Sequence, residues 1–252
     1  MNIKYNEQQI LELYSEGKTD KEIADFFGVT ETAFACKRRR LGIPTHKNYM
    51  RENYIPTKSE LAIIIGTLLG DATIRLVHNK CKYPNLTFVH SPKQEEYFNC
   101  KTNKLKLFCS SAKKYEDKNK LNKYGYKLVY TGMNMKCLEE IRNIFYPNNK
   151  KILPIQYLKE YFTEESLYYM FMDDGSYDIC TNSYIINTQC FTKENLLDFI
   201  KLLKEKFDLS FSIKADNCLY LKHESNKNLK NILIKYNECN SMQYKCGDEG
   251  HR

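Results

Sequence analysis

The sequence predicts an α+β fold in which two similar halves follow a small all-α unit. An apolar run of helical length that ends in an aspartate occurs at residues 64–72 and again at residues 167–175. After each run the pattern changes to short strands and further helices in the same order, whereas residues 5–43 show only helical periodicity. The two aspartates, Asp71 and Asp174, are 103 residues apart. Because the order of elements recurs at this interval, an internal duplication is the simplest explanation.

The composition excludes membrane and secreted classes. The chain has 252 residues, of which 42% are hydrophobic, so it is long enough to form a substantial core. It has no apolar run near the roughly 18 residues that a membrane span requires, and no basic-then-apolar leader. Its ten cysteines are scattered and form no Cys-x-x-Cys pair, so we expect free thiols. We therefore expect an intracellular, cytoplasmic protein without a membrane partner.

The net charge of +8 and the sequence pI of about 8.8 favour an anionic partner. Lysines are interleaved with asparagines and with the 20 tyrosines rather than gathered in one block. Lys and Arg contacts to phosphates supply most non-specific affinity for nucleic acid. Charge alone raises the expectation of a nucleic-acid partner only slightly.

The N-terminal unit, residues 1–45, is expected to contain three short helices. Gly17 ends the first apolar stripe, and Asp20 can cap the second helix. Gly28 suits the left-handed backbone of a tight turn, and Thr30 is a good N-cap for the third helix.

The turn in this unit resembles the helix-turn-helix family in its spacing Ala24-x-x-x-Gly28-Val29. That resemblance implies that the third helix enters the major groove of DNA. The alternative is a small helical unit used for protein contacts, with a solvated basic face. The candidate phosphate contacts at the end of the third helix are Lys37, Arg38, Arg39 and Arg40.

Residues 46–56 are expected to be a linker, because the hydrophobic periodicity lapses between Pro44 and Pro56. The first half is then assigned to residues 57–155. It opens with a capping box in which Thr57 and Glu60 satisfy each other's backbone amides.

The first motif helix carries Gly66 and Gly70 one turn apart. Two glycines cost a helix about 1 kcal/mol each, so close approach by another helix is the expected compensation. The expected partner is the second motif helix, residues 164–174, capped by Thr163. Packing of these two helices would bring Asp71 and Asp174 together.

Two alternating strands are expected after the first aspartate, at residues 72–76 and 85–88. The side chains expected on the core face are Ile74, Leu76, Leu86 and Phe88. The side chains expected on the opposite, polar face are Thr73, Arg75, Asn85 and Thr87.

The remaining elements recur in the same order in both halves. In the first half we expect a helix from Pro92 to about Cys109, a hairpin of residues 113–116 and 126–131, a helix over 134–145 and a lysine-bearing loop over 147–154. In the second half, residues 156–246, we expect strands at 183–190, 211–214 and 218–221 and helices at 192–207 and 229–234.

Each half also ends in a lysine, Lys151 in the first and Lys245 in the second. Residues 247–252 are left as a tail. A zinc site of Cys239, Cys246 and His251 is disfavoured because the spacing is irregular.

A carboxylate at the end of a buried helix suits a hard divalent cation such as Mg²⁺, which takes one or two protein oxygens and leaves room for water and phosphate. Such ions activate water and stabilise a leaving oxyanion in phosphodiester hydrolysis. A lysine nearby would neutralise charge on the phosphate. An aspartate is disfavoured at a helix C-terminus by the helix dipole, so two such aspartates indicate metal binding rather than capping.

These motifs resemble the two copies of the LAGLIDADG motif of the homing endonucleases. The second copy matches at Leu167, Asp174 and Gly175; the first matches at Gly66 and Asp71 and has Ala72 in place of the last glycine. The chain most resembles the monomeric, two-motif branch represented by intron-encoded yeast mitochondrial endonucleases, over roughly residues 57 to 246.

The resemblance implies two αββαββα halves packed through the motif helices, with a saddle of two sheets over a long, nearly asymmetric site in double-stranded DNA and cleavage of both strands. It implies that Asp71 and Asp174 are metal ligands and that Lys151 and Lys245 are basic catalytic residues. The candidate DNA contacts on the sheets are then Thr73, Arg75, Asn85, Thr87, Lys113, Lys127, Asn187 and Gln189.

The competing hypothesis is a nucleic-acid binder that does not cut, either a maturase that acts on intron RNA or a transcription regulator that uses the helix-turn-helix. Retention of both aspartates and both lysines argues against it, because a pure binding protein needs none of them.

Overall fold

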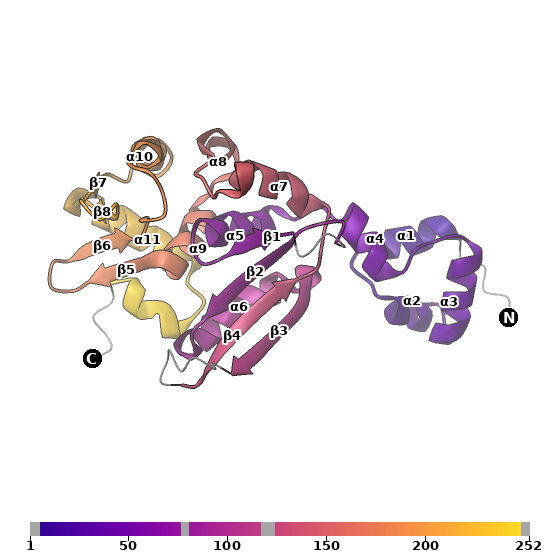
Figure 1. The fold of residues 1–252 in the computed structure, drawn as a ribbon. Helices are drawn as coiled ribbons and strands as arrows, with labels where there is room; N and C mark the ends of the chain where they lie inside the picture. The colour runs from indigo at the N-terminus through magenta and orange to yellow at the C-terminus, as the bar shows by residue number, and fades with distance from the viewer. Residues whose placement is uncertain (1–5, 77–80, 117–123, 248–252) are drawn as a thin grey trace.

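The fold consists of an N-terminal helical unit followed by two halves that each contain a four-stranded antiparallel sheet (Figure 1). The computed structural model describes residues 6–76, 81–116 and 124–247. The strand order is β1-β2-β4-β3 in the first sheet and β5-β6-β8-β7 in the second. The two orders are equivalent, so the prediction of two similar α+β halves is confirmed.

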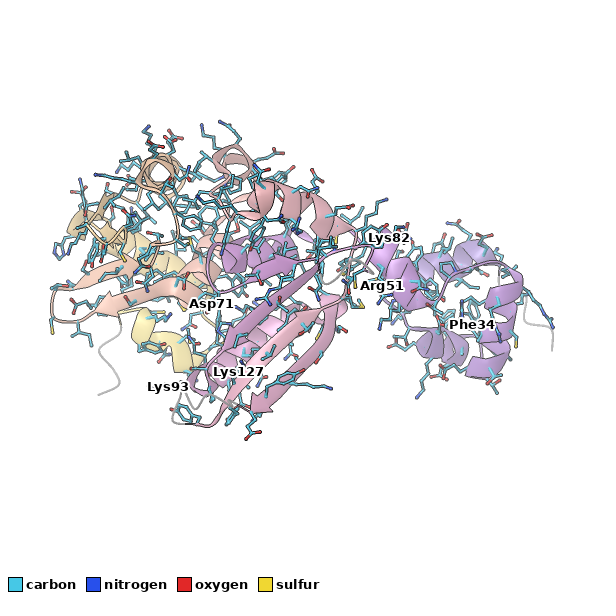
Figure 2. All side chains as sticks on the ribbon, viewed as in Figure 1. Phe34, Arg51, Asp71, Lys82, Lys93 and Lys127 are labelled. Carbon is cyan, nitrogen blue, oxygen red and sulfur yellow. The ribbon has the colours of Figure 1, made fainter. Side chains whose placement is uncertain are left out.

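Three helices form the N-terminal unit as predicted: α1 (Glu7–Ser15), α2 (Asp20–Phe26) and α3 (Glu31–Arg40). They share a small core of their own, which includes Phe34 (Figure 2). Gly28 has a φ of 64°, as expected for the turn before α3. Thr19 rather than Asp20 caps α2, through a capping box with Glu22.

The prediction of a linker at residues 46–56 was wrong, because this segment contains helix α4 (His46–Asn53). Its periodicity is short, but Thr45 caps it and Met50 is buried. The helix is attached to the first half by hydrogen bonds at its C-terminal end. The backbone amide of Lys136 donates to the Arg51 carbonyl at 2.8 Å, and Lys82 pairs with Glu52 at 2.8 Å. Figure 2 labels Arg51 and Lys82 at this junction.

The elements of the first half are α5 (Lys58–Leu69), β1 (Thr73–Arg75), β2 (Asn85–His90), α6 (Glu95–Lys104), β3 (Cys109–Glu116), β4 (Tyr126–Gly132), α7 (Cys137–Phe145) and α8 (Ile155–Tyr161). The elements of the second half are α9 (Glu164–Asp174), β5 (Gly175–Asp178), β6 (Ser183–Ile186), α10 (Lys193–Phe207), β7 (Phe211–Ile213), β8 (Leu219–Leu221) and α11 (Asn226–Tyr236). A 3-10 segment, Asn240–Lys245, follows α11. Both halves thus share the order αββαββα, and the first half adds α8 at its end. Among the α-helices and strands of the described residues, the sequence patterns missed α4, α8 and β5.

Helices α5 and α9 pack side by side at the centre of one core that both halves share. A Cβ added at Gly66 would lie 2.2 Å from the backbone oxygen of Ser166, and one added at Gly70 would lie 2.5 Å from Cβ of Asp173. Nothing larger than glycine fits at either position without a shift. The predicted role of the two glycines is therefore confirmed.

The first sheet turns one face to the core, with two exceptions to the predicted alternation. Ile74, Leu86 and Phe88 are buried, but Leu76 is 49% exposed because β1 ends one residue before it. Asn85 is only 5% exposed, because β2 begins in a segment where Tyr83 and Pro84 are also buried.

All ten cysteines are free thiols, as predicted. His251, part of the disfavoured zinc site, lies outside the described residues. Within the described ranges no helix combines the length and apolar character that crossing a bilayer demands.

Candidate active site

The two motif helices end next to each other, and this places three carboxylates in one region. Asp71 follows Gly70 at the end of α5, and Asp173 and Asp174 are the last two residues of α9. Because Gly70 contacts Asp173, the two helix ends are in direct contact. Asp71, whose side chain is 36% exposed, lies between the two sheets (Figure 2).

The surroundings of Asp71 and Asp174 disfavour the charged form of both carboxyl groups. Partial burial and the nearby charges of Asp173 and Asp174 raise the pKa of Asp71 to about 7. Burial and the charge of Asp173 raise the pKa of Asp174 to about 6. A divalent cation between these groups would remove the repulsion, and carboxylate oxygens are the donors that hard cations prefer. The residues therefore fit a divalent metal.

Both predicted lysines reach this region and are anchored by backbone carbonyls of the motif helices. Nζ of Lys151 donates to the Gly70 carbonyl at 3.1 Å. Nζ of Lys245 donates to the carbonyls of Met172 at 2.7 Å and Asp173 at 3.2 Å. Burial lowers the pKa of both lysines, although nearby carboxylates oppose this effect.

Each lysine is fixed to the motif helix of its own half, and the charge of each acts on both Asp71 and Asp174. Lys151 is the cation that most lowers the pKa of Asp174. Lys245 lowers the pKa of Asp71, after Lys101. The structure thus brings together all four predicted residues at the adjoining ends of α5 and α9.

Sequence reasoning missed a buried polar cluster behind Asp71. Nζ of Lys101 donates to the two carboxylate oxygens of Asp173 at 2.8 and 3.1 Å, and the Tyr97 hydroxyl donates to Oδ1 of Asp173 at 2.8 Å. The Lys101 and Asp173 side chains are both fully buried. Burial alone would raise the pKa of Asp173, but the charge of Lys101 and the hydrogen bonds from Lys101 and Tyr97 outweigh it and lower this pKa.

His90 lies between the two aspartates. Its Nδ1 is 3.5 Å from Oδ2 of Asp71, and its Nε2 is 3.7 Å from Oδ1 of Asp173. Burial and the charge of Lys101 lower the pKa of His90 to about 3, so the ring is neutral near pH 7. The donor atoms of these three residues lie within 4.8 Å of one another, but Lys101 already neutralises Asp173. The trio therefore supports Asp71 rather than forming a separate metal site.

Two signals in the sequence could have revealed this cluster. Lys101 lies four residues after Tyr97 and four before Leu105, which places it on the apolar stripe of its helix. Asp173 directly precedes Asp174 inside an apolar helix, where a second carboxylate needs a partner.

The predicted DNA contacts divide into accessible and inaccessible residues. Asn85 is buried, and so is Arg38, whose guanidinium pairs with Asp20 at 3.3 Å and donates to the Ile43 carbonyl at 2.8 Å. These two predictions were wrong, because each side chain is enclosed by its own unit. The exposed or half-exposed candidates are Thr73, Arg75, Thr87, Lys113, Lys127, Asn187, Gln189, Lys37, Arg39 and Arg40.

The outer face of the first sheet presents a polar row that the sequence only partly indicated. Thr73 lies opposite Thr87, and Thr87 lies opposite Thr131, which in turn lies opposite Ser111. Lys127, labelled in Figure 2, is exposed on the same sheet. The corresponding row of the second sheet consists of Ser176, Ile185, Tyr220 and Ser212.

Comparisons with known proteins agree with this arrangement. The intron-encoded endonuclease ai4 of Dictyostelium discoideum is 30% identical over 166 residues, which cover 60% of this chain and 97% of that protein. The probable intron-encoded endonuclease 1 of Wickerhamomyces canadensis is 28% identical over 206 residues, covering 75% of this chain and 85% of that protein. The structure of the homing endonuclease I-WcaI bound to its DNA recognition sequence matches with a TM-score of 0.67 and 26% identity, over 77% of this chain and 88% of that chain.

The family profile described as the LAGLIDADG DNA endonuclease family matches residues 61–232, which include both motif helices and both sheets. This chain belongs to the LAGLIDADG DNA endonuclease family.

Proposed function

We propose that this DNA endonuclease hydrolyses one phosphodiester bond in each strand of a long, asymmetric double-stranded site and uses Mg²⁺ to do so. The observation that carries the proposal is the pair of centres at the ends of α5 and α9, each with one aspartate and one lysine. One chain supplies both centres, so a monomer suffices for a double-strand break.

Asp71 and Asp174 would hold the divalent cation through their carboxylates. Bound there, the cation supplies Lewis acidity, which acidifies a water molecule and stabilises the leaving oxygen. Lys151 and Lys245 are held by backbone carbonyls, so their ammonium groups are oriented before substrate arrives. They would neutralise the charge that develops on the phosphate oxygens.

The outer faces of the two sheets are proposed to lie in the major groove. On the first sheet the threonine row can exchange hydrogen bonds with base edges, and Arg75, Lys113 and Lys127 supply charge for bases or phosphates. Beyond the end of β6, which stops at Ile186 rather than at residue 190 as predicted, the exposed Asn187 and Gln189 offer amides of the kind that read adenine.

The N-terminal unit is proposed to contact DNA outside the cleavage site. Arg39 and Arg40 are exposed at the end of α3, in the helix that the helix-turn-helix resemblance assigns to the groove. Because α4 is hydrogen-bonded to the first half, this contact would be held in a defined position relative to the cleavage centres.

The test is incubation with Mg²⁺ and a plasmid that carries the host sequence joined across the insertion point of this gene. The parent chain should produce linear plasmid, and Asp174→Asn should not. Asp198→Asn, which alters an exposed carboxylate on α10, is the matched control and should cut like the parent. Tight binding by the parent without any strand break would contradict the proposal and favour the maturase or regulator hypothesis.

A further inference from the structure

The buried polar cluster, defined as His90, Tyr97, Lys101 and Asp173, joins the two halves. His90, Tyr97 and Lys101 come from the first half, on β2 and α6, and Asp173 comes from the second, on α9. Lys101 and Asp173 are 72 positions apart in the chain, and their ion pair has no solvent exposure. Taking two charges out of water is costly unless further hydrogen bonds satisfy them, and the Tyr97 hydroxyl supplies one.

The cluster has no counterpart behind Asp174. The residue before Asp71 is Gly70, so the position of Asp173 carries no side chain in the first motif. Thr73 pairs with Thr87 in the first sheet as Ser176 pairs with Ile185 in the second, so Thr87 and Ile185 are equivalent positions. Three residues after them come His90 in the first half and Thr188 in the second. The Thr188 hydroxyl donates to the Asn217 carbonyl instead, at 2.6 Å.

Helix α10 of the second half also lacks the buried lysine that α6 contributes to the cluster in the first half. Ser91 and Thr192 are the equivalent cap residues, and counting ten residues onward from each reaches Lys101 in one half and Leu202 in the other. Leu202 is 1% exposed and lies in the apolar core. The second half therefore has an apolar side chain where the first half has a buried ammonium.

The cluster contacts Asp71 through His90, and it contacts Lys245 through the backbone of Asp173. His90 is held against Asp173 and faces the Asp71 carboxylate. The backbone carbonyl of Asp173 accepts from Lys245 at 3.2 Å. Fixing Asp173 thus holds His90 against Asp71 and also holds Lys245.

We propose that His90, Tyr97, Lys101 and Asp173 are positioning residues for Asp71 and not for Asp174, so that cleavage of one DNA strand depends on the cluster and cleavage of the other does not. The inference rests on the proposed endonuclease function. It makes the two centres chemically unequal within one chain.

The decisive variant is the double substitution Lys101→Met/Asp173→Ala. Each single substitution leaves a buried charge without its partner and is expected to destabilise the fold strongly, whereas removal of both partners of a buried pair is often close to neutral. The double variant separates positioning from stability. Tyr97→Phe is a milder probe, because it removes one donor and keeps the ring.

A matched control is available on the same helix. Lys104 pairs with Glu238 across the same two halves at 2.8 Å, but this pair is solvent-exposed. Lys104→Met/Glu238→Gln therefore removes an inter-half ion pair of similar geometry that does not contact the active site.

The experiment measures cleavage of each strand separately, with an end-labelled duplex of the host sequence joined across the insertion point, and nicked circle with the matching plasmid. We expect Lys101→Met/Asp173→Ala to slow one strand at least tenfold more than the other and to accumulate nicked circle. The slowed strand should be the one that Asp71→Asn slows more than Asp174→Asn does. Tyr97→Phe should shift the ratio in the same direction, and the Lys104/Glu238 control should leave it unchanged.

Two measurements without metal accompany it. The melting temperature and the DNA affinity of the double variant in EDTA should stay near those of the parent. The ¹⁵N signals of the His90 ring should show a proton on Nδ1 in the parent, because that nitrogen faces oxygens of Asp71 and Gln94. In the double variant the ring should show a different tautomer or an average of both tautomers.

Equal slowing of both strands by the double variant, or an unchanged strand ratio, would overturn the inference while the endonuclease function stands. Failure of the parent to cut either strand would instead contradict the proposed function itself.

Discussion

At the scale of single residues, Asp71 and Asp174 are partly buried and lie beside the negative charge of Asp173. Their raised pKa values, about 7 and about 6, are the measurable result. A folded, metal-free chain therefore keeps protons on these groups at pH values where the unfolded chain has released them.

This titration predicts a pH-dependent stabilisation by Asp71→Asn in EDTA. Between the ordinary aspartate pKa of 3.8 and about 7, folding takes up a proton at Asp71, so the contribution of this group to the unfolding free energy falls as pH rises through that window. Asparagine does not titrate. The melting temperature of Asp71→Asn relative to the parent should therefore increase from pH 4 to pH 7 and level off above it.

Differential scanning fluorimetry at several pH values measures this difference, and a growth of a few degrees is expected. Asp198→Asn serves as the control, because its carboxylate lies on the exposed surface of α10 and its difference from the parent should stay flat. If the difference in melting temperature between Asp71→Asn and the parent stays constant with pH, the folded protein does not raise the pKa of Asp71.

Sequence reasoning located all four residues of the two centres but not the residues behind them. Asp71, Asp174, Lys151 and Lys245 recur at matching places in the two halves, so the duplication itself marks them. The residues of the buried polar cluster do not recur in the second half, so the duplication does not mark them. Lys101 lies on the apolar stripe of its helix, but its partner Asp173 is 72 positions away in the chain and only the fold places the two together.

At the scale of elements, the packing of α5 on α9 decides where the two centres lie. The helices touch backbone to backbone at Gly66, because the added Cβ would lie 2.2 Å from the Ser166 carbonyl oxygen. A carbonyl in a packed helix cannot move without its neighbours, so the contact fixes the separation of the two helices.

Gly66→Ala should therefore be destabilising although alanine is the better helix former. The gain in helix propensity is about 1 kcal/mol, and overpacking typically costs about 1–3 kcal/mol and more where backbone must move. We expect a lower melting temperature and weaker cleavage of both strands, since both helix ends shift.

Thermal unfolding with Lys58→Ala as the control tests this expectation, because Lys58 lies in the exposed first turn of the same helix. If Gly66→Ala melts at or above the temperature of the parent, the close contact is not a constraint on the helix pair.

The elements that the sequence patterns missed are short and depend on context. Helix α4 has a single buried residue, Met50, and a polar remainder, so its periodicity is too weak to distinguish it from a linker. Strand β5 begins at Gly175, immediately after α9, where the helix pattern masks it. The long motif helices, by contrast, can be predicted from their caps and their continuous apolar runs.

At the scale of the whole molecule, the N-terminal unit is proposed to contact DNA apart from the two sheets. Arg39 and Arg40 are exposed on α3, whereas Arg38 is bound to Asp20 inside the unit. The candidate phosphate contacts on α3 that remain accessible are therefore Lys37, Arg39 and Arg40.

Arg39→Gln/Arg40→Gln should weaken DNA binding and reduce its salt dependence. Each lost phosphate contact changes the slope of log K against log salt concentration by about 0.9, so two contacts give about 1.8. Fluorescence anisotropy between low and moderate salt, in EDTA with a duplex that extends beyond the cleavage site, measures the slope.

Lys201→Gln on the exposed surface of α10 should leave this slope unchanged and serves as the control. An unchanged slope in the double arginine variant would mean that α3 does not contact phosphates, and that the N-terminal unit binds another partner.

The distribution of cores has a consequence for how such a chain can be rebuilt. Both halves share one continuous core, while the three N-terminal helices have a core of their own, against which Tyr49 of α4 packs. Gly17 of the N-terminal unit also lies against Leu107 of the first half. The halves are therefore inseparable, and a new half must carry a matching motif helix. The N-terminal unit is exchangeable only together with α4, and a replacement must again cover Leu107.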